Sequence, residues 1–417
     1  MSPLDQSRTV RINESPHSAG AAGSREWAAP LAGDYVVVDR SSDEAWIIDD
    51  PVIVRLTGGR LLATWTVRTR TNDRTRPLTY RCAMAHSDDD GANWRRIGEL
   101  SAVSALAFIH GGDLLLMHHE QGRRNICLRR SNDEGLTWSD PITLFEGGFW
   151  NAPTAMATRN GILYRALDAP VEGRSLSETR QSRVIAGDLD GDLMDPGAWR
   201  ISPGVAYPGT PAGLSRGMYP FGQHPRVRVH DHWLEPNVVN VRGRLRVFHR
   251  TRIDGYATAS IAGICDLEDD GNAMTYRFAQ FHPLPGAQNQ FHIFYDGPTD
   301  LYWMTSNIPT DSQNVLGHGE QLWKRRFKSG MGNERRMLLL FYSVDALNWF
   351  QAGVIAMSAN PLQSYHYTYP LPDGEDLLIL SRTSVNAPNQ HDSDTVTFHR
   401  VRRFRRLAVN LQADIPD

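Results

Sequence analysis

Side chains that can exchange protons or bind anions gather at particular places in this 417-residue chain, at the start of some apolar runs and just after others. A carboxylate can act as a general acid or base, an arginine can bind an anion, and a tyrosine or histidine can exchange a proton. The candidates are Asp49, Asp50, Asp73, His118, His119, Glu120, Asn151, Glu235, Arg250, His292, Tyr365, His366, His391 and Asp392. Their joint chemistry depends on whether the fold brings them to one place.

A repeated turn indicates which structural elements position these residues. "SNDEGLTW", Ser131 to Trp138, has a cousin 44 residues earlier in "SDDDGANW", Ser87 to Trp94, and "SVDALNW", Ser343 to Trp349, is a copy that is one residue short. A repeat at that period is typical of stacked or radial architectures. Short runs rich in Val, Ile, Leu, Tyr and Trp alternate with Gly, Asp, Asn and Pro turns, which indicates an all-β chain.

These runs group in fours, and six such groups begin near residues 49, 104, 151, 235, 290 and 364. Six four-stranded antiparallel units predict a six-bladed β-propeller, which closes on itself and leaves only short edges. We expect residues 31–417 to form this single domain, and residues 1–30, rich in Ser, Ala, Gly and Pro, to form a flexible tail. In each blade the start of the first strand and the loop after the second strand lie on one face. The candidate residues fall at those positions, so we expect them to form one site, with the repeated turns on the opposite face.

The turns resemble the Asp-box, and residues 45 to 405 resemble the sialidase (neuraminidase) superfamily over nearly their whole length. "HWLEPNVVNVRGRLRVFHRT" is similar to the family's run in which a Glu precedes a strand and an Arg follows fifteen residues later, here Glu235 and Arg250. "NERRMLLLFYSVDALNW" resembles the segment with a site arginine, here Arg335. "SYHYTYPLPDG" resembles the family's nucleophile strand, which implies Tyr365 as the nucleophile. "DDPVIVRLTGGRLLATWTVRTRTND" resembles the family's first-blade run that ends in the catalytic Asp, here Asp73.

The resemblance implies an exo-acting, retaining glycoside hydrolase with Tyr365 as nucleophile, Glu235 as its base and Asp73 as acid/base. A tyrosine with a free pKa near 10 does need a base within hydrogen-bond reach. Structural roles remain open for each residue: Glu235 could cap a strand, Tyr365 could pack with its tyrosine neighbours, and Asp73 could belong to a plain charged loop.

One position departs from the family's pattern. The first run should open with Arg-Ile-Pro, and this chain has Asp49 and Asp50 before the proline. The arginines that grip a sialic acid carboxylate are then reduced to Arg250 and Arg335, with Asp49 at the missing position. Because an acidic group would repel a substrate carboxylate, either another cation compensates, with Arg68 and Arg70 nearby in the sequence, or the substrate is not an ordinary sialoside. We expect the second, a sugar other than ordinary sialosides. Asp49 and Asp50 would then bind sugar hydroxyls or pair with the arginines.

The histidines are unexpected in a sialidase. His118, His119, His292 and His391 are predicted to bind sugar hydroxyls. A second interpretation is a polysaccharide lyase that uses His and Tyr against a uronate, and a third is a metal site at His391, Asp392 and Asp394. The ligand spacing typical of metal sites is missing, so we expect no metal and no cofactor. A propeller that binds carbohydrate without turnover is the alternative outside the enzymes.

Composition narrows the remaining classes. The chain is 41% hydrophobic with a net charge of −3, which argues against a nucleic-acid binder. Three cysteines cannot form a disulfide framework. The sequence lacks an apolar signal segment and a membrane-spanning run, so we expect a cytoplasmic protein with a carbohydrate as its partner and no membrane association, although a mature secreted form would read the same. A homo-oligomer is left open.

Overall fold

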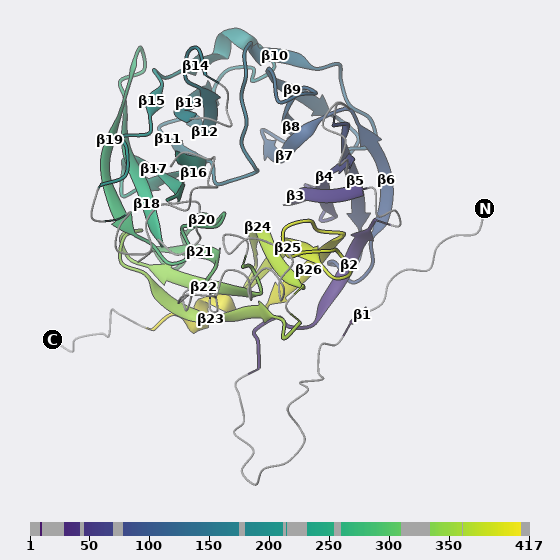
Figure 1. The fold of residues 1–417 in the computed structure, drawn as a ribbon. Coiled ribbons are helices and arrows are strands. Elements are labelled where there is room, and N and C mark those ends of the chain that lie inside the picture. The colour runs from purple at the N-terminus through teal and green to yellow at the C-terminus, as the bar shows by residue number, and fades with distance from the viewer. Residues whose placement is uncertain are drawn as a thin grey trace, which may run out of the picture.

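The computed structural model describes residues 9–10, 29–41, 46–69, 78–174, 180–211, 214, 232–253, 260–309, 334–360 and 362–409. Six small antiparallel sheets surround a common centre, which confirms the predicted six-bladed β-propeller (Figure 1). Within the described residues, no helix is both long and apolar enough to pass through a bilayer.

The first three blades follow the chain in order, each running from the centre of the ring outward. Blade one holds β3 (Trp46–Arg55), β4 (Leu61–Thr69), β5 (Tyr80–Ser87) and β6 (Arg95–Leu100). Blade two holds β7 (Val103–His110), β8 (Asp113–His119), β9 (Ile126–Ser131) and β10 (Ile142–Phe145). Blade three holds β11 (Ala157–Arg159), β12 (Ile162–Pro170), β13 (Arg180–Asp188), β14 (Trp199–Ile201) and β15 (Val205–Ala206), and a short 3-10 helix, η1 (Pro196–Ala198), precedes β14.

The next two blades repeat the pattern. Blade four holds β16 (His232–Val241), β17 (Arg244–Arg252), β18 (Ile261–Asp269) and β19 (Met274–Pro283). Blade five holds β20 (His292–Asp296), β21 (Leu301–Asn307), β22 (Met337–Ser343) and β23 (Phe350–Met357).

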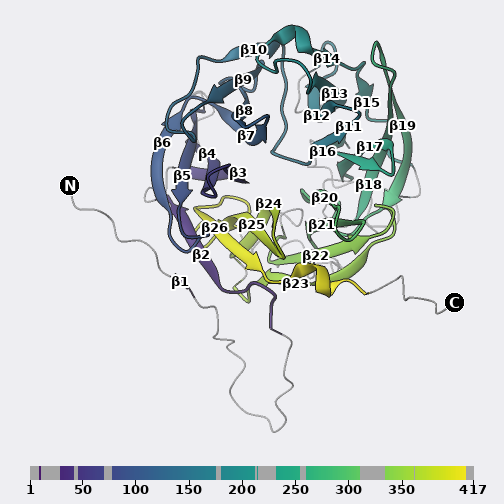
Figure 2. The ribbon, with the colours of Figure 1, turned by 180° about the vertical axis from the view of Figure 1, so that it is seen from behind.

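Blade six closes the ring with strands from both ends of the chain. It holds β24 (Ser364–Asp373), β25 (Asp376–Ser384) and β26 (Thr395–Val401), followed by the 3-10 helix η4 (Phe404–Leu407). Its outer strand is β2 (Tyr35–Arg40), which pairs with β26 and in turn with β1 (Thr9–Val10). Both ribbon views show this purple segment beside the yellow strands (Figure 2). The N-terminal strand therefore joins the two ends of the propeller, an arrangement that the sequence analysis did not assign.

The core of the protein lies between neighbouring blades. Six buried apolar clusters of described residues occupy the six junctions, including the one between blades six and one, where Leu378 and Val396 meet Ile53 and Trp65. Because each sheet buries both faces, each blade is held by its two neighbours. The inner strands therefore present their ends around the axis at fixed positions.

The repeated turns join the third and fourth strands of blades one, two and five. In the turn 131–138 the Ser131 hydroxyl donates to Asp133 at 2.9 Å, the Thr137 amide donates to the same carboxylate at 2.8 Å, and the Trp138 indole donates to the Gly135 carbonyl at 3.1 Å. The corresponding distances in the turn 87–94 are 2.9, 2.8 and 3.1 Å. These turns lie at the strand ends opposite the starts of the inner strands, as expected.

The shortened turn keeps its aspartate and loses a bond. Asp345 accepts from the Asn348 amide at 2.8 Å. The turn lacks the glycine that elsewhere has a φ of +89° and accepts from the tryptophan. Accordingly, the Trp349 indole nitrogen is buried without a hydrogen-bond partner among the described residues.

Candidate active site

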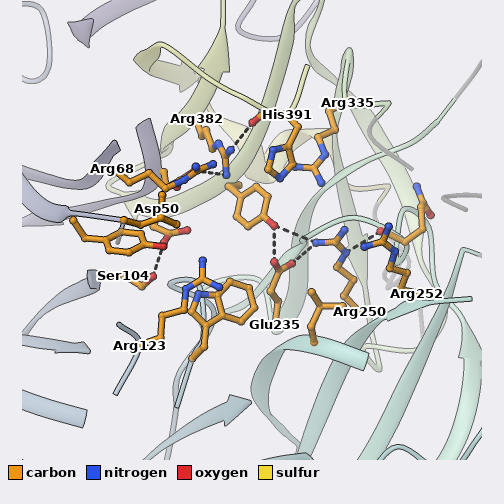
Figure 3. Close-up of a pocket in the computed structure, with 17 residues that line it drawn as sticks. Asp50, Arg68, Ser104, Arg123, Glu235, Arg250, Arg252, Arg335, Arg382 and His391 are labelled. Carbon is orange, nitrogen blue, oxygen red and sulfur yellow. Dashed lines mark hydrogen bonds and ion pairs between the residues drawn. The ribbon is translucent and has the colours of Figure 1, made fainter. Parts of the chain in front are cut away.

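A pocket of about 370 Å³ opens at the centre of the ring, where the inner strands begin. All six blades contribute to its wall (Figure 3). The lining residues are Asp49, Asp50, Arg68, Leu78, Tyr80, Ser104, Arg123, Trp150, Leu234, Glu235, Arg250, Arg252, Gln288, Arg335, Tyr367, Arg382 and His391. The face predicted from strand order therefore carries a pocket.

The same backbone irregularity places four of these residues. Asp50, Ser104, Glu235 and Tyr367 have φ values of +53°, +49°, +53° and +48°. Each lies where the register of an inner strand with its neighbour slips, between 49 and 52, 103 and 106, 234 and 237, and 366 and 369. Bulges of this kind re-aim side chains, and left-handed backbone at residues other than glycine is strained. Blades one, two, four and six thus each aim one polar side chain at the pocket.

The centre of the pocket is a tyrosine–carboxylate–arginine cluster. The Tyr367 hydroxyl donates to Glu235 Oε1 at 2.5 Å, and Arg250 lies 2.7 Å from Glu235 Oε2 and 3.1 Å from the Tyr367 oxygen. Burial alone would raise the pKa of Glu235, but Arg250, the Tyr367 hydroxyl and Arg335 together lower it. Glu235 is therefore a carboxylate that already accepts the phenolic proton in a hydrogen bond, the arrangement that a base-activated nucleophile requires.

Tyr367, rather than Tyr365, is the tyrosine at this position, so the predicted pairing of Tyr365 with Glu235 is wrong. Tyr365 is buried in the core between blades five and six, with its ring 6.0 Å from that of Tyr35 and 5.7 Å from that of His399. In a regular strand residues 365 and 367 would point to the same side. The bulge at Tyr367 separates them, sending one ring into the core and the other into the pocket.

A third arginine, Arg382 of β25, joins Arg250 and Arg335 around this tyrosine. The guanidinium groups of Arg335 and Arg382 lie 5.2 and 5.1 Å from the centre of the Tyr367 ring. Arg335 is also held by His366 Nδ1 at 2.8 Å. The expectation that only two arginines surround the site is therefore wrong, because Arg382 reaches it from a strand to which the sequence analysis gave no role.

Asp49 is neutralised by two arginines. Arg382 lies 2.6 Å from one of its oxygens, and Arg68 binds the other. Burial alone would raise the pKa of Asp49, but Arg382 and Arg68 lower it. Pairing of Asp49 with Arg250 or Arg335, which the sequence had suggested, is not what the structure has. The premise that an unpaired carboxylate repels an anionic substrate therefore fails.

The pocket as a whole carries an excess of positive charge. Its described lining includes six arginines, at 68, 123, 250, 252, 335 and 382, against three carboxyl groups, at 49, 50 and 235. Arg123 also lies 5.1 Å from the centre of the Trp150 ring, whose other contact is Arg180 at 4.8 Å. Arginines match carboxylates with two parallel hydrogen bonds, so the arrangement is suited to an anionic ligand.

A buried carboxyl supports Glu235 from behind. Asp168 accepts the Glu235 backbone N–H at 3.2 Å and pairs with Arg180 at 2.9 Å. Burial raises the pKa of Asp168 to about 7, although Arg180 and the Glu235 amide oppose the rise. Asp168 does not line the pocket, so its role is to hold the strained backbone of Glu235.

Three of the four predicted histidines are buried and do not line the pocket. His118, His119 and His292 are each at most 4% exposed. Burial lowers the pKa of His118 to about 4 and that of His292 to about 3, and it holds the pKa of His119 well below its usual value. Their assignment to substrate binding is wrong for this pocket. His391 does line it, with Nδ1 3.1 Å from Asp392.

Other assignments receive no structural test. Asp73 lies outside the described residues, so its role stays a prediction. In the part of the chain that the structure describes, no group of three or more His, Cys, Asp or Glu side chains is arranged to hold a metal ion. Near His391, Asp392 accepts from Asn389, and Asp394 accepts the amides of Val385 and Asn386.

Sequence reasoning missed Tyr367, Arg382, Ser104 and Arg123. The sequence carries a signal for the bulges only where a carboxylate directly precedes proline, at Asp50-Pro51 and Glu235-Pro236. "SYHYTYP" carries no comparable mark that singles out its second tyrosine. Arg382 falls inside an apolar strand, where its contact with Asp49, 333 residues away, has no local signature.

Comparison with known proteins bears on the fold. No protein-family model and no curated protein sequence matches the chain. A Dyadobacter fermentans protein of unknown function aligns with a TM-score of 0.55 at 12% identity, over 88% of this chain and 97% of its own. A Fusarium graminearum α-L-arabinofuranosidase carrying a point mutation, in complex with an iminosugar inhibitor, aligns at 0.55 and 11% identity, over 89% and 98%.

A sialidase of Trypanosoma rangeli in complex with sialic acid aligns with a TM-score of 0.53 at 17% identity, covering 98% of this chain and 60% of its own. The chain thus spans nearly the full length of the first two structures and about three fifths of this sialidase. At these identities, the likenesses establish a six-bladed propeller fold that sialidases and an arabinofuranosidase share with this chain.

Proposed function

We propose that the protein is an exo-acting, retaining glycoside hydrolase that removes a terminal sugar bearing a carboxylate. The observation that carries the proposal is the 2.5 Å hydrogen bond from the Tyr367 hydroxyl to Glu235, at the centre of an arginine-lined pocket. Tyr367 is the proposed nucleophile and Glu235 the base that takes its proton.

The chemistry proceeds in two steps that balance. The Tyr367 oxygen attacks the anomeric carbon as its proton passes to Glu235, and the bond to the leaving group breaks as the glycosidic oxygen receives a proton from an acid. Water then attacks the same carbon and gives a proton to the conjugate base of that acid, while the bond to Tyr367 breaks and the tyrosine recovers its proton from Glu235. Two displacements at one carbon retain its configuration. A buried tyrosine has a raised pKa, so attack depends on the neighbouring carboxylate.

The substrate class follows from charge and size. Arg250, Arg335 and Arg382 surround the nucleophile, and Asp49 is already neutralised, so a carboxylate on the sugar meets net positive charge. A hydrogen bond from a charged group contributes about 1.5–3 kcal/mol to binding. A pocket of about 370 Å³ is at the small end of ligand pockets, which favours a terminal sugar over the interior of a long glycan. The likeness in fold to a sialidase solved with sialic acid agrees with this class.

The test is a panel of aryl glycosides that share one leaving group. Sialosides and uronosides form the anionic arm, and arabinofuranosides, galactosides and glucosides form the neutral arm. We expect turnover in the anionic arm, with the first-formed sugar in the configuration of the substrate when followed by NMR. Tyr367→Phe should abolish this turnover and Tyr365→Phe should retain it.

Three results would contradict the proposal. Turnover confined to neutral sugars would reject the substrate class. Release of the inverted anomer, or full activity in Tyr367→Phe, would reject the nucleophile. Tight binding of anionic sugars with no turnover would instead identify a carbohydrate-binding propeller.

A uronate-directed lyase is the second candidate, and His391 favours it. Burial lowers the pKa of His391 to about 4, so the imidazole is neutral at pH 7 and able to accept a proton in a pocket rich in arginine. The same screen distinguishes the two reactions when uronate polysaccharides are added and the absorbance of an unsaturated product is recorded.

A further inference from the structure

The pocket's three described carboxyl groups differ in their partners. Glu235 pairs with Arg250 at 2.7 Å, and Asp49 pairs with Arg382 at 2.6 Å and also with Arg68. Asp50 instead accepts a hydrogen bond from the neutral Ser104 hydroxyl at 2.6 Å. Within the described part of the pocket, Asp50 is therefore the carboxyl group that is not held ionised by an arginine in contact with it.

Asp50 also lies on the side of the pocket where a proton donor is required, opposite Glu235. It comes from blade one, whereas Glu235 comes from blade four, on the opposite side of the six-membered ring. Figure 3 shows the two carboxyl groups on different sides of the pocket. In a double displacement the acid must face the nucleophile across the anomeric carbon. A sugar seated between these walls would have Tyr367 and Glu235 on one side and Asp50 on the other.

The backbone holds Asp50 in the same manner as the two residues of the proposed nucleophile pair. Asp50 and Glu235 both have φ of +53°, and both precede a proline. Ser104, the partner of Asp50, is fixed in turn because its amide donates to the Thr66 hydroxyl at 3.0 Å. Strain of this kind persists only where the surrounding structure imposes it, and it is concentrated at functional sites.

The groups around Asp50 come from several elements. Asp49 is its neighbour on β3, Arg382 faces it from β25, Arg123 from the segment after β8, and Arg165 from β12. Burial and the Asp49 carboxylate raise the pKa of Asp50 to about 7, while the Ser104 hydroxyl and the arginines at 382 and 123 oppose the rise. A carboxyl group that titrates near neutral pH can donate a proton in one step and accept one in the next.

We propose that Asp50 is the acid/base of this site, in place of the sequence-assigned Asp73. The inference rests on the proposed glycosidase function. In the first step the Asp50 proton passes to the glycosidic oxygen as the bond between that oxygen and the anomeric carbon breaks. In the second step the resulting carboxylate takes a proton from the attacking water, which restores Asp50 and completes the balance.

The test compares Asp50→Asn with the matched variant Asp73→Asn, using two aryl glycosides of one anionic sugar. One carries an acidic phenol as leaving group and the other a weakly acidic alcohol. A poor leaving group needs the proton and a good one does not. We expect Asp50→Asn to lower kcat/KM by about 10²–10⁴-fold for the poor leaving group and by less than about tenfold for the good one. Asp73→Asn should affect both substrates equally and weakly.

The pH profile provides a second measurement that does not require the asparagine variant to fold. In the native protein kcat/KM should fall on the alkaline side with an apparent pKa near 7. Ser104→Ala removes a hydrogen bond that stabilises the Asp50 carboxylate, so this limb should move to higher pH. A purely structural role for Ser104 would lower activity at every pH without moving the limb.

The outcomes separate the acid/base assignment from the proposed function. If Asp73→Asn shows the leaving-group dependence and Asp50→Asn does not, or if Ser104→Ala leaves the alkaline limb in place, the role of Asp50 is overturned while the glycosidase stands. If the native protein hydrolyses no glycoside, or if Tyr367→Phe is fully active, the proposed function itself fails and Asp50 loses its role with it.

Discussion

The two faces of this propeller both carry carboxyl groups, but the groups on one face have local hydrogen-bond partners and those on the other have distant partners. On the face of the repeated turns, Asp89 and Asp133 accept hydrogen bonds from residues no more than four positions away. Those bonds, first from Asn93 and Thr137, lower the pKa of the two carboxyl groups. On the pocket face, the contacts of Asp49, Asp50 and Glu235 come from residues 15 to 333 positions away. The surroundings of the turn carboxyl groups are set by nearby residues in the sequence. The surroundings of the pocket carboxyl groups depend on the assembled blades.

The difference teaches where stability and function reside. The hydrogen bonds of Asp89 and Asp133 are local and nearly identical in geometry, so we expect each aspartate to stabilise its own turn. The pocket combines strained backbone with buried charges that depend on several blades at once. Changes to the pocket should therefore alter activity far more than changes to the turns, and changes to the turns should alter stability alone.

The largest expected effect breaks the pocket at its centre. Tyr367→Phe removes the hydroxyl that donates to Glu235 and should lower kcat on the active glycoside by at least about 10³-fold, since a covalent route is lost. Tyr365→Phe is the matched control, two residues away on the same strand, and should stay within about threefold of the native rate. Steady-state kinetics decide the matter; equal losses in both variants would remove the distinction between the two rings.

The next effect concerns Asp50 and pH. Its pKa is about 7 in the native protein and near 3.9 in an unfolded chain, so the unfolded chain releases its proton at lower pH. The Asp50 contribution to stability is therefore complete below about pH 4 and is lost as the pH rises through 7. Each pH unit between the two values removes about 1.4 kcal/mol, or a few kcal/mol in all.

Asp50→Asn cannot undergo this titration. The free energies of unfolding of the variant and the native protein can be measured with denaturant from pH 4 to pH 8. The value for the variant minus the value for the native protein should increase as pH rises. Asp168 titrates in the same direction in both proteins and cancels in the difference. A difference that is constant with pH would show that Asp50 is ionised throughout.

A third change sharpens the account of the arginines. Arg382→Gln removes one of the two cations that neutralise Asp49, and it removes a cation beside Tyr367. KM for the carboxylate-bearing substrate should rise about 10–100-fold, the equivalent of about 1.5–3 kcal/mol. Arg81→Gln, on the exposed outer surface of β5, is the control and should leave KM unchanged. An unaltered KM in Arg382→Gln would show that Arg382 does not bind the substrate carboxylate and that, of the three arginines around Tyr367, only Arg250 and Arg335 remain as candidates.

The smallest effect belongs to the turns. Asp133→Ala removes the acceptor shared by the Ser131 and Thr137 hydroxyls and the Thr137 amide, and should cost about 1–3 kcal/mol of unfolding free energy. Asn132→Ala in the same turn is exposed and should change stability by less than about 0.5 kcal/mol. Both variants should retain full activity. A loss of activity in folded Asp133→Ala would show that the two faces are coupled.

Much of the architecture could be predicted from the sequence because it depends on local patterns. The turn period and the alternation of apolar runs with turn residues predicted six blades, and the order of strands within a blade predicted which ends would form the site. Glu235 and Arg250 were assigned from the resemblance of their run to the sialidase family and from their places at the start of one strand and the end of the next, and the structure pairs them at 2.7 Å. The closing strand β2 was missed because its pairing with β26 spans almost the whole chain.

Only the tertiary structure decided how the site is wired. A single bulge turns Tyr367 toward Glu235 and leaves Tyr365 in the core, although both obey the same alternation in the sequence. From the sequence, the Asp49 carboxylate was expected to repel an anionic substrate. In the structure its charge is balanced by Arg68 and Arg382, which reach it from different strands. Backbone irregularities and ion pairs across blades have no local pattern. The sequence by itself therefore determined the ring and the face of the pocket, and the packing of six blades determined which side chains meet there.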